Sequence, residues 1–196
     1  AAGCGSDDED DTTATTEDGG CGFEVGAAPT CEGEADGVLS IGAILPETGS
    51  LAFLGPPEFA AAELAVAEIN AAGGVLGEDV LYRPGDSGDT STEIATQTVT
   101  AHLDAGVDAV VGAASSGVSF TVIDQLVGAC KIHFSPANTS PDFTEYEEDN
   151  LYFRTAPSDV LQGRVLADLM VEEGNATAAI MALQDPYGEG LLRYTK

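Results

Sequence analysis

The chain has 196 residues, of which 34 are Asp or Glu and 6 are Lys or Arg, so its formal charge is −28. Nucleic-acid binders use clustered cations to displace counterions from phosphates. Here the few cations stand singly among carboxylates, so we expect no nucleic-acid partner. No run of 18 apolar residues is present, and we expect no membrane-spanning helix. The hydrophobic fraction of 43% suffices for one core, or for one full lobe and part of another.

Residues 1–37 contain 11 acidic residues and no Lys or Arg. Such a segment buries too little apolar surface to offset its ordering entropy, so we predict a disordered, extended tether that makes no contact with the folded part. Cys4 follows three small residues and resembles the lipidated cysteine of bacterial lipoproteins; the alternative is a free thiol in a tail. Cys21 and Cys31 lie ten residues apart, and either they form a disulfide or they stay unpaired.

From residue 38 onward, short apolar runs alternate with amphipathic stretches. Helical spacing of apolar residues, with cap residues before it, predicts helices that begin near residues 56, 90, 115 and 160. The short apolar runs predict strands at residues 38–45, 80–83, 108–111, 132–135, 151–154 and 178–183. This alternation with short connections predicts an α/β fold with a doubly wound, mainly parallel sheet.

In such a sheet, ligands bind beyond the carboxyl ends of the strands. The loops expected there, residues 47–50, 112–116 and 135–139, are rich in hydroxyl groups and backbone amides. Ser116 stands at the start of a helix and can present its hydroxyl, free backbone N–H groups and the positive end of the helix dipole to a carboxylate. On these residues alone, Ser115 and Ser116 can equally be plain helix caps.

An enzymatic function is weakly indicated. Residues 85–88 resemble the nucleophile loop of serine proteases, and His102 with Asp104 would complete a triad on paper. Here these residues fall at a strand-to-helix turn instead of in an antiparallel barrel, so we predict no enzyme. We expect His102 on a helix flank and His133 in a strand, as a packing residue that points opposite to its neighbours. Their spacing is not that of zinc ligands, so we expect neither a metal nor another cofactor.

Six segments, in their order and spacing, resemble the type I periplasmic binding proteins. They are most similar to the leucine/isoleucine/valine-binding branch, the substrate-binding subunits of branched-chain amino-acid ABC importers. The segments are residues 69–77, 115–116, 135–144, 153–155, 162–163 and 185–190. The resemblance implies an extracytoplasmic protein whose two lobes close on a free amino acid and deliver it to permease subunits. A sensor or receptor domain of the same fold is the alternative.

The resemblance also implies the ligand contacts. Ser116 and Thr139 would bind the α-carboxylate and the α-amine of the amino acid, helped by the backbone of Ala137. Tyr187 would approach the ligand from the second lobe. Ser115 is a neighbouring candidate.

Three further residues complete the predicted site. Asn138 stands beside the threonine, where it either adds a polar contact to the ligand or completes a turn. The loop with Phe53 and Leu54 would cover the side chain of the ligand.

The resemblance covers residues 38–196, and members of the family are much longer. It therefore implies a fragment: residues 1–37 form a lipoprotein tether, residues 38–157 the N-terminal ligand-binding lobe, and residues 158–196 the truncated start of a second lobe. With Cys4 lipidated, the protein would be anchored to the cell membrane, either in the periplasm or on the outer face.

Overall fold

The computed structural model describes Cys31 and residues 36–196. The predicted lipid site at Cys4, the cysteine at position 21 and almost all of the predicted tether lie outside these residues.

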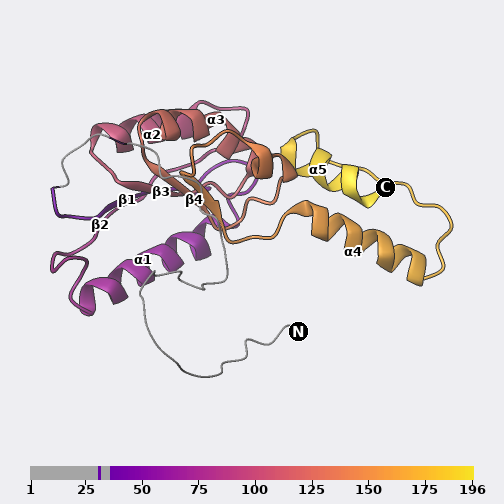
Figure 1. The fold of residues 1–196 in the computed structure, drawn as a ribbon, viewed down its shortest axis with the longest axis horizontal. Helices are drawn as coiled ribbons and strands as arrows, with labels where there is room; N and C mark the ends of the chain where they lie inside the picture. The colour runs from indigo at the N-terminus through magenta and orange to yellow at the C-terminus, as the bar shows by residue number, and fades with distance from the viewer. Residues whose placement is uncertain (1–30, 32–35) are drawn as a thin grey trace, which may run out of the picture.

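A parallel sheet forms the centre of the described part (Figure 1). Every neighbouring pair of strands in it is parallel. The chain runs from β1 outward to β2, then crosses back to β3 on the other side of β1, which makes the gap between β1 and β3 the switch point where ligands bind. The predicted doubly wound sheet is therefore confirmed. Its strands are β1 (Ser40–Ile44), β2 (Leu81–Arg83), β3 (Ala109–Gly112), β4 (Ile132–Ser135) and β5 (Tyr152–Arg154), in the spatial order β2-β1-β3-β4-β5.

Helices cover both faces of the sheet. α2 (Ile94–Asp104) and α3 (Ser116–Gly128) lie on one face, and α1 (Gly55–Ala71) lies on the other (Figure 1). The main core fills the space between the sheet and the α2–α3 layer. It consists of small and branched apolar side chains, namely Ile44, Ala95, Val99, Val107, Val110, Ala113, Val118, Val122 and Leu126.

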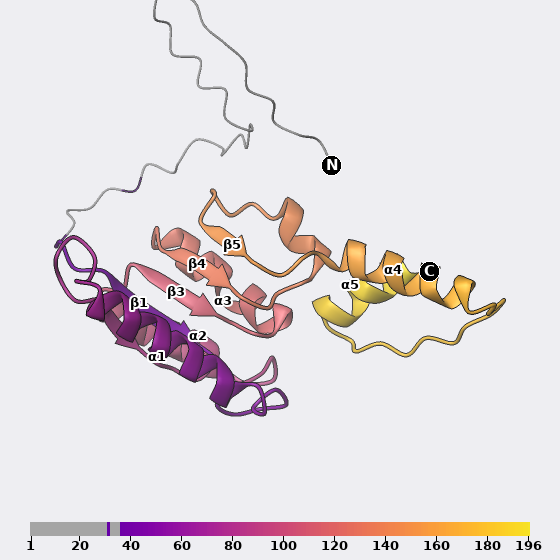
Figure 2. The same cartoon turned by 90° about the horizontal axis from the view of Figure 1, so that it is seen from below.

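The last two helices lie together beyond one end of the sheet (Figure 2). A short 3-10 helix, η1 (Pro141–Glu145), follows β4, and α4 (Asp159–Glu172) and α5 (Pro186–Thr195) pack against each other. Gly163 permits this packing, because a Cβ atom there would lie 2.7 Å from the backbone of Tyr194.

The strand predicted at residues 178–183 is not formed. Residues 177–183 carry no regular structure, and Met181 is 99% exposed. An isolated strand leaves its backbone N–H and C=O groups without partners, and none of the described strands lies beside this segment. An apolar run therefore does not become a strand here.

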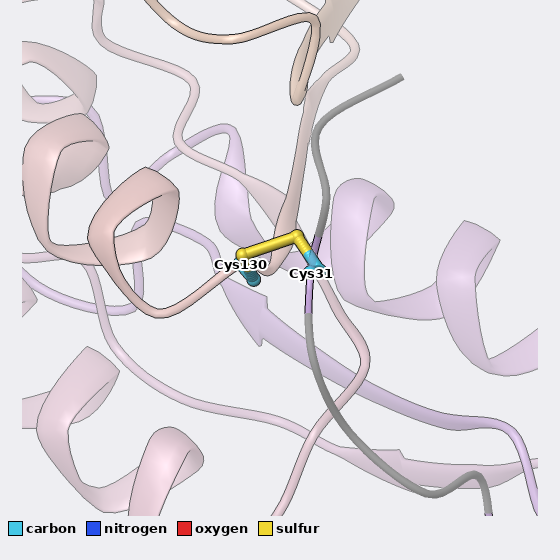
Figure 3. The surroundings of a disulfide bond; sticks show 2 residues. All are labelled: Cys31 and Cys130. Carbon is cyan, nitrogen blue, oxygen red and sulfur yellow. A yellow bond between two sulfur atoms is a disulfide. The ribbon is translucent and has the colours of Figure 1, made fainter.

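The cysteines pair differently from either alternative. Cys31 forms a disulfide with Cys130, with 5.7 Å between the two Cα atoms (Figure 3). Cys31 is thus not bonded to Cys21, and the prediction that residues 1–37 make no contact with the lobe is wrong at this residue. Cys130 lies two residues before the start of β4, so the bond lies at the end of the sheet where the strands begin, opposite to the predicted ligand loops.

His102 and His133 are both structural. His102 lies in the last turn of α2, where its ring is buried against β1 and its Nε2 atom lies 3.0 Å from the carbonyl oxygen of Ala43. The protease-like Ser87 donates to the carbonyl oxygen of Gly88 at 3.3 Å. The hydrogen bonds of the described residues therefore do not join these groups into a triad.

The environment of His133 is apolar. The ring is fully buried, packs edge-on against Tyr152, and Nε2 donates to the carbonyl oxygen of Gly112 at 2.8 Å. Its neighbours Ile132 and Phe134 point to the opposite, more exposed face, as predicted. Burial lowers the pKa of His133 to about 4, although the hydrogen bond to Gly112 favours the charged form.

We expect this histidine to make the lobe acid-sensitive. Below pH 6.5 the unfolded chain takes up a proton at His133, whereas the folded chain does not until about pH 4. The free energy of unfolding should therefore fall by about 2 kcal/mol between pH 7 and pH 5 on account of this residue. Urea unfolding at pH 7 and at pH 5 measures this fall in the parent and in His133→Gln. The variant keeps a hydrogen-bond donor near Gly112 but does not titrate in this range. An equally steep loss of stability in both proteins would contradict the assignment.

Candidate ligand-binding site

A cleft of about 360 Å³ lies beyond the carboxyl ends of β1, β3 and β4. Loops of the sheet form one wall, and the α4–α5 region contributes residues to the other. The first wall consists of Ser50, Leu51, Leu54, Gly88, Asp89, Thr90, Ala114, Ser115, Ser116, Ala137 and Thr139, and the second of Gln162, Leu183, Asp185 and Tyr187.

Two serines at the start of α3 have different roles. Ser115 is the N-cap, and its Oγ accepts a hydrogen bond from the backbone N–H of Val118 at 3.3 Å. Ser116 does not cap the helix: its Oγ accepts from the backbone N–H of Ser140 at 3.3 Å. The hydroxyl proton of Ser116 is therefore available to a group in the cleft, beside the positive end of the helix dipole.

Asn138 lies behind the cleft and does not line it. The side chain is fully buried, and its Nδ2 donates to the carbonyl oxygens of Ala113 and Ala114 at 3.0 and 3.2 Å. Its Oδ1 accepts from the hydroxyl of Tyr152 at 3.0 Å. These bonds tie the loop after β4 to the loop after β3. Of the two alternatives for Asn138, these bonds favour a structural role, because the polar atoms of its side chain hold the cleft wall in place.

Thr139 is held by a residue that the sequence did not single out. Its Oγ1 donates to Oδ2 of Asp159 at 2.9 Å, and the backbone N–H of Asp159 donates to the carbonyl oxygen of Thr139 at 2.8 Å. Asp159 is fully buried, which raises the pKa of its carboxyl, while the hydrogen bond from Thr139 and the charge of Arg154 act in the opposite direction. In the sequence, Asp159 follows a serine cap in the first turn of a predicted helix, where an acidic residue is ordinary.

The loop before α1 places only one of its two apolar candidates in the cleft. Leu54 lines the cleft, whereas Phe53 does not and is 73% exposed. Residues 51–54 form turns that lead into α1. The prediction that Phe53 covers the ligand is not met in this structure.

Tyr187 and Ala137 both line the cleft, on opposite walls. Tyr187 lies in the first turn of α5. The N-cap of this helix is Asp185, whose Oδ1 accepts from the backbone N–H of Gly188 at 2.7 Å. None of the residues that line the cleft is Lys or Arg. A carboxylate in the cleft would therefore meet hydroxyl and backbone N–H groups, whereas a cation would meet hydroxyl and carbonyl oxygens and the carboxylates of Asp89 and Asp185.

Three further features of the described residues, concerning a metal site, a second cavity and membrane-spanning helices, add no functional site. No group of three or more His, Cys, Asp or Glu side chains among them is arranged to hold a metal ion. A second hollow of similar volume lies at the start of α1, lined by Glu47, Ala52, Gly55, Pro56, Phe59 and Pro84, without the convergent hydroxyl groups of the cleft. In the same part of the chain, no helix is both long and apolar enough to cross a bilayer.

Comparison with known proteins identifies the family. Residues 38–196 match the family described as periplasmic binding protein. The chain belongs to this family. It is 33% identical, over 177 residues, to the Leu/Ile/Val-binding protein homolog 2 of Brucella abortus, a match that covers 90% of this chain and 47% of that protein. The chain therefore spans about half the length of this periplasmic binding protein.

Solved structures of periplasmic binding proteins show the same fold. An ABC transporter substrate-binding protein from Desulfitobacterium hafniense, in complex with Leu, is 31% identical with a TM-score of 0.63, covering 80% of this chain and 45% of that one. The branched-chain amino acid transporter substrate-binding protein LivJ from Streptococcus pneumoniae, in complex with isoleucine, is 27% identical with a TM-score of 0.65, covering 81% and 45%. The parallel sheet and the helices that cover it thus form a lobe of a type I periplasmic binding protein.

Proposed function

We propose that this chain forms the first lobe and the beginning of the second lobe of an extracytoplasmic protein that binds a free amino acid and delivers it to an ABC importer. The observation that carries the proposal is the pair of hydroxyl groups, Ser116 and Thr139, that line one cleft at the switch point of the sheet. Support comes from the relatives. One is named as a Leu/Ile/Val-binding protein homolog, and two solved structures hold leucine or isoleucine.

The cleft provides a binding site for each end of an amino acid. The hydroxyl of Ser116 and the N-terminal amides of α3 would bind the α-carboxylate. The hydroxyl of Thr139 and the carbonyl oxygen of Ala137 would bind the α-amine. Residues 38–157 would supply the first wall of the site. Tyr187, which belongs to residues 158–196, would contact the ligand from the opposite wall.

The compartment and the anchor are part of the same proposal. The Cys31–Cys130 disulfide supports an oxidising, extracytoplasmic location. We place a lipid on Cys4, with the acidic residues that precede Cys31 between the membrane and the lobe.

A thermal-shift screen of the complete natural protein against the common amino acids tests the proposed function. We expect leucine, isoleucine or valine to stabilise the protein by about 2.7 kcal/mol at 100 times its dissociation constant. The Ser116→Ala/Thr139→Val double variant is the control and should show a much smaller shift. If no amino acid raises the melting temperature of the parent, the proposed function is wrong.

A further inference from the structure

The two hydroxyl groups of the cleft have opposite hydrogen-bond roles toward the protein. The Oγ atom of Ser116 accepts a hydrogen bond from the backbone N–H of Ser140 at 3.3 Å. The Oγ1 atom of Thr139 donates its proton to Oδ2 of Asp159 at 2.9 Å. A hydroxyl has one proton and two lone pairs. Ser116 therefore has its proton left for a ligand, whereas Thr139 has only lone pairs left.

The direction of the Thr139 bond follows from the surroundings of Asp159. A carboxylate can only accept hydrogen bonds, so the proton between these two side chains belongs to Thr139. Burial raises the pKa of the Asp159 carboxyl, whereas the hydrogen bond from Thr139 and the positive charge of Arg154 favour the carboxylate form. The guanidinium of Arg154 is held nearby, because it donates to the carbonyl oxygen of Ser140 at 2.6 Å and to Oγ1 of Thr144 at 2.9 Å.

Asp159 acts from behind the cleft. It is fully buried and is not among the residues that line the cleft. Its backbone N–H also holds the carbonyl oxygen of Thr139 at 2.8 Å, so the threonine is fixed at two points. The second carboxylate oxygen, Oδ1, is buried with no hydrogen-bond partner among the described residues. Burying a carboxylate with an unsatisfied oxygen is costly, and capping a helix does not require it, because Ser158 already caps α4.

We propose that Asp159 is a positioning residue that fixes the hydroxyl of Thr139 as a hydrogen-bond acceptor, and thereby makes the cleft select ligands with an α-ammonium group over analogues with an α-carbonyl group. This inference rests on the proposed function, because it assumes that the ligand is an amino acid. An ammonium group donates to the lone pairs of Thr139. The oxygen of an oxo acid would face those lone pairs and be repelled.

The test compares two ligands that differ only at this position, L-leucine and 4-methyl-2-oxopentanoate, by calorimetric titration of the complete natural protein. In Asp159→Leu the proton of Thr139 is released and can be donated to the oxo group. We expect the affinity for leucine to fall about ten- to a hundredfold, and the affinity for the oxo acid to rise about two- to tenfold. If the variant weakens both ligands by the same factor, Asp159 has only a structural role and the proposal is wrong.

Two further variants separate hydrogen-bond direction from charge. Asp159→Asn keeps an oxygen that can accept from Thr139, so it should retain most of the preference for leucine. If it behaves like Asp159→Leu, the charge of Asp159 and not the hydrogen bond decides, which contradicts the proposal. Asp168→Asn removes an exposed carboxylate from the same helix, and both affinities should stay those of the parent; a change as large as that in Asp159→Leu would also contradict the proposal.

A measurement without ligand keeps the inference separate from the proposed function. If the parent binds neither leucine nor any other amino acid, the proposed function fails. The hydrogen bond from Thr139 to Asp159 is then tested by NMR of the free protein alone. We expect a slowly exchanging hydroxyl proton of Thr139 in the free protein, which disappears in Asp159→Leu. A rapidly exchanging Thr139 hydroxyl in the parent would overturn the role assigned to Asp159.

Discussion

The variant Cys31→Ser should unfold about 4.7 kcal/mol more easily than the parent. The disulfide to Cys130 closes a loop of 99 residues, and a covalent loop of that length restricts the unfolded chain by about this free energy in the chain-entropy description. The loop contains β1, α1, β2, α2, β3 and α3, so the bond stabilises most of the sheet. Urea unfolding at neutral pH, without reductant, measures the difference.

Matched cysteine variants identify the pairing. Cys130→Ser should lose the same stability as Cys31→Ser, and reduction of the parent should reproduce both. Cys21→Ser should unfold like the parent. A destabilised Cys21→Ser together with a parent-like Cys130→Ser would show that Cys31 pairs with Cys21 instead.

Removing the two cleft hydroxyls should weaken ligand binding strongly. Each hydroxyl is proposed to bind a charged end of the amino acid, and a hydrogen bond to a charged group contributes about 1.5–3 kcal/mol. Ser116→Ala and Thr139→Val should each weaken leucine binding by that amount in the complete natural protein, and the double variant by about 3–6 kcal/mol if the two losses add. Calorimetric titration measures all three.

The control for this series is a buried serine outside the cleft. Ser87 donates to the carbonyl oxygen of Gly88 and does not line the cleft, so Ser87→Ala should bind leucine like the parent. Ser115→Ala should instead lose about 0.5–2 kcal/mol of stability, because Ser115 is the cap of α3. Parent-like binding by Ser116→Ala and Thr139→Val would show that the cleft hydroxyls do not hold the ligand.

The central sheet was predictable because its signal is local. Each strand of the sheet is a short apolar run between helical patterns, and its length together with the turn residues that flank it distinguishes it from a helix segment. The same pattern located the loops after β1, β3 and β4, and therefore the cleft. The role of His133 was also predictable, since alternation along β4 places it opposite to Ile132 and Phe134.

The features that sequence reasoning missed depend on contacts between distant residues. Residues 178–183 have the composition of a strand, but pairing depends on a neighbouring strand that composition does not reveal. Cys31 and Cys130 are too far apart in sequence for spacing to pair them. Asn138 and Asp159 are ordinary loop and helix-start residues in the sequence, and only the packing of the loop after β4 against its neighbours shows what they hold.

The most direct test of the proposed function is a crystal structure of the complete natural protein with leucine. We predict that the amino acid lies in the cleft between Ser116 and Thr139, with a carboxylate oxygen about 2.5–3.0 Å from Oγ of Ser116 and the ammonium nitrogen about 2.7–3.2 Å from Oγ1 of Thr139. Leucine bound elsewhere, or bound in this cleft without contact to either hydroxyl, would contradict the account.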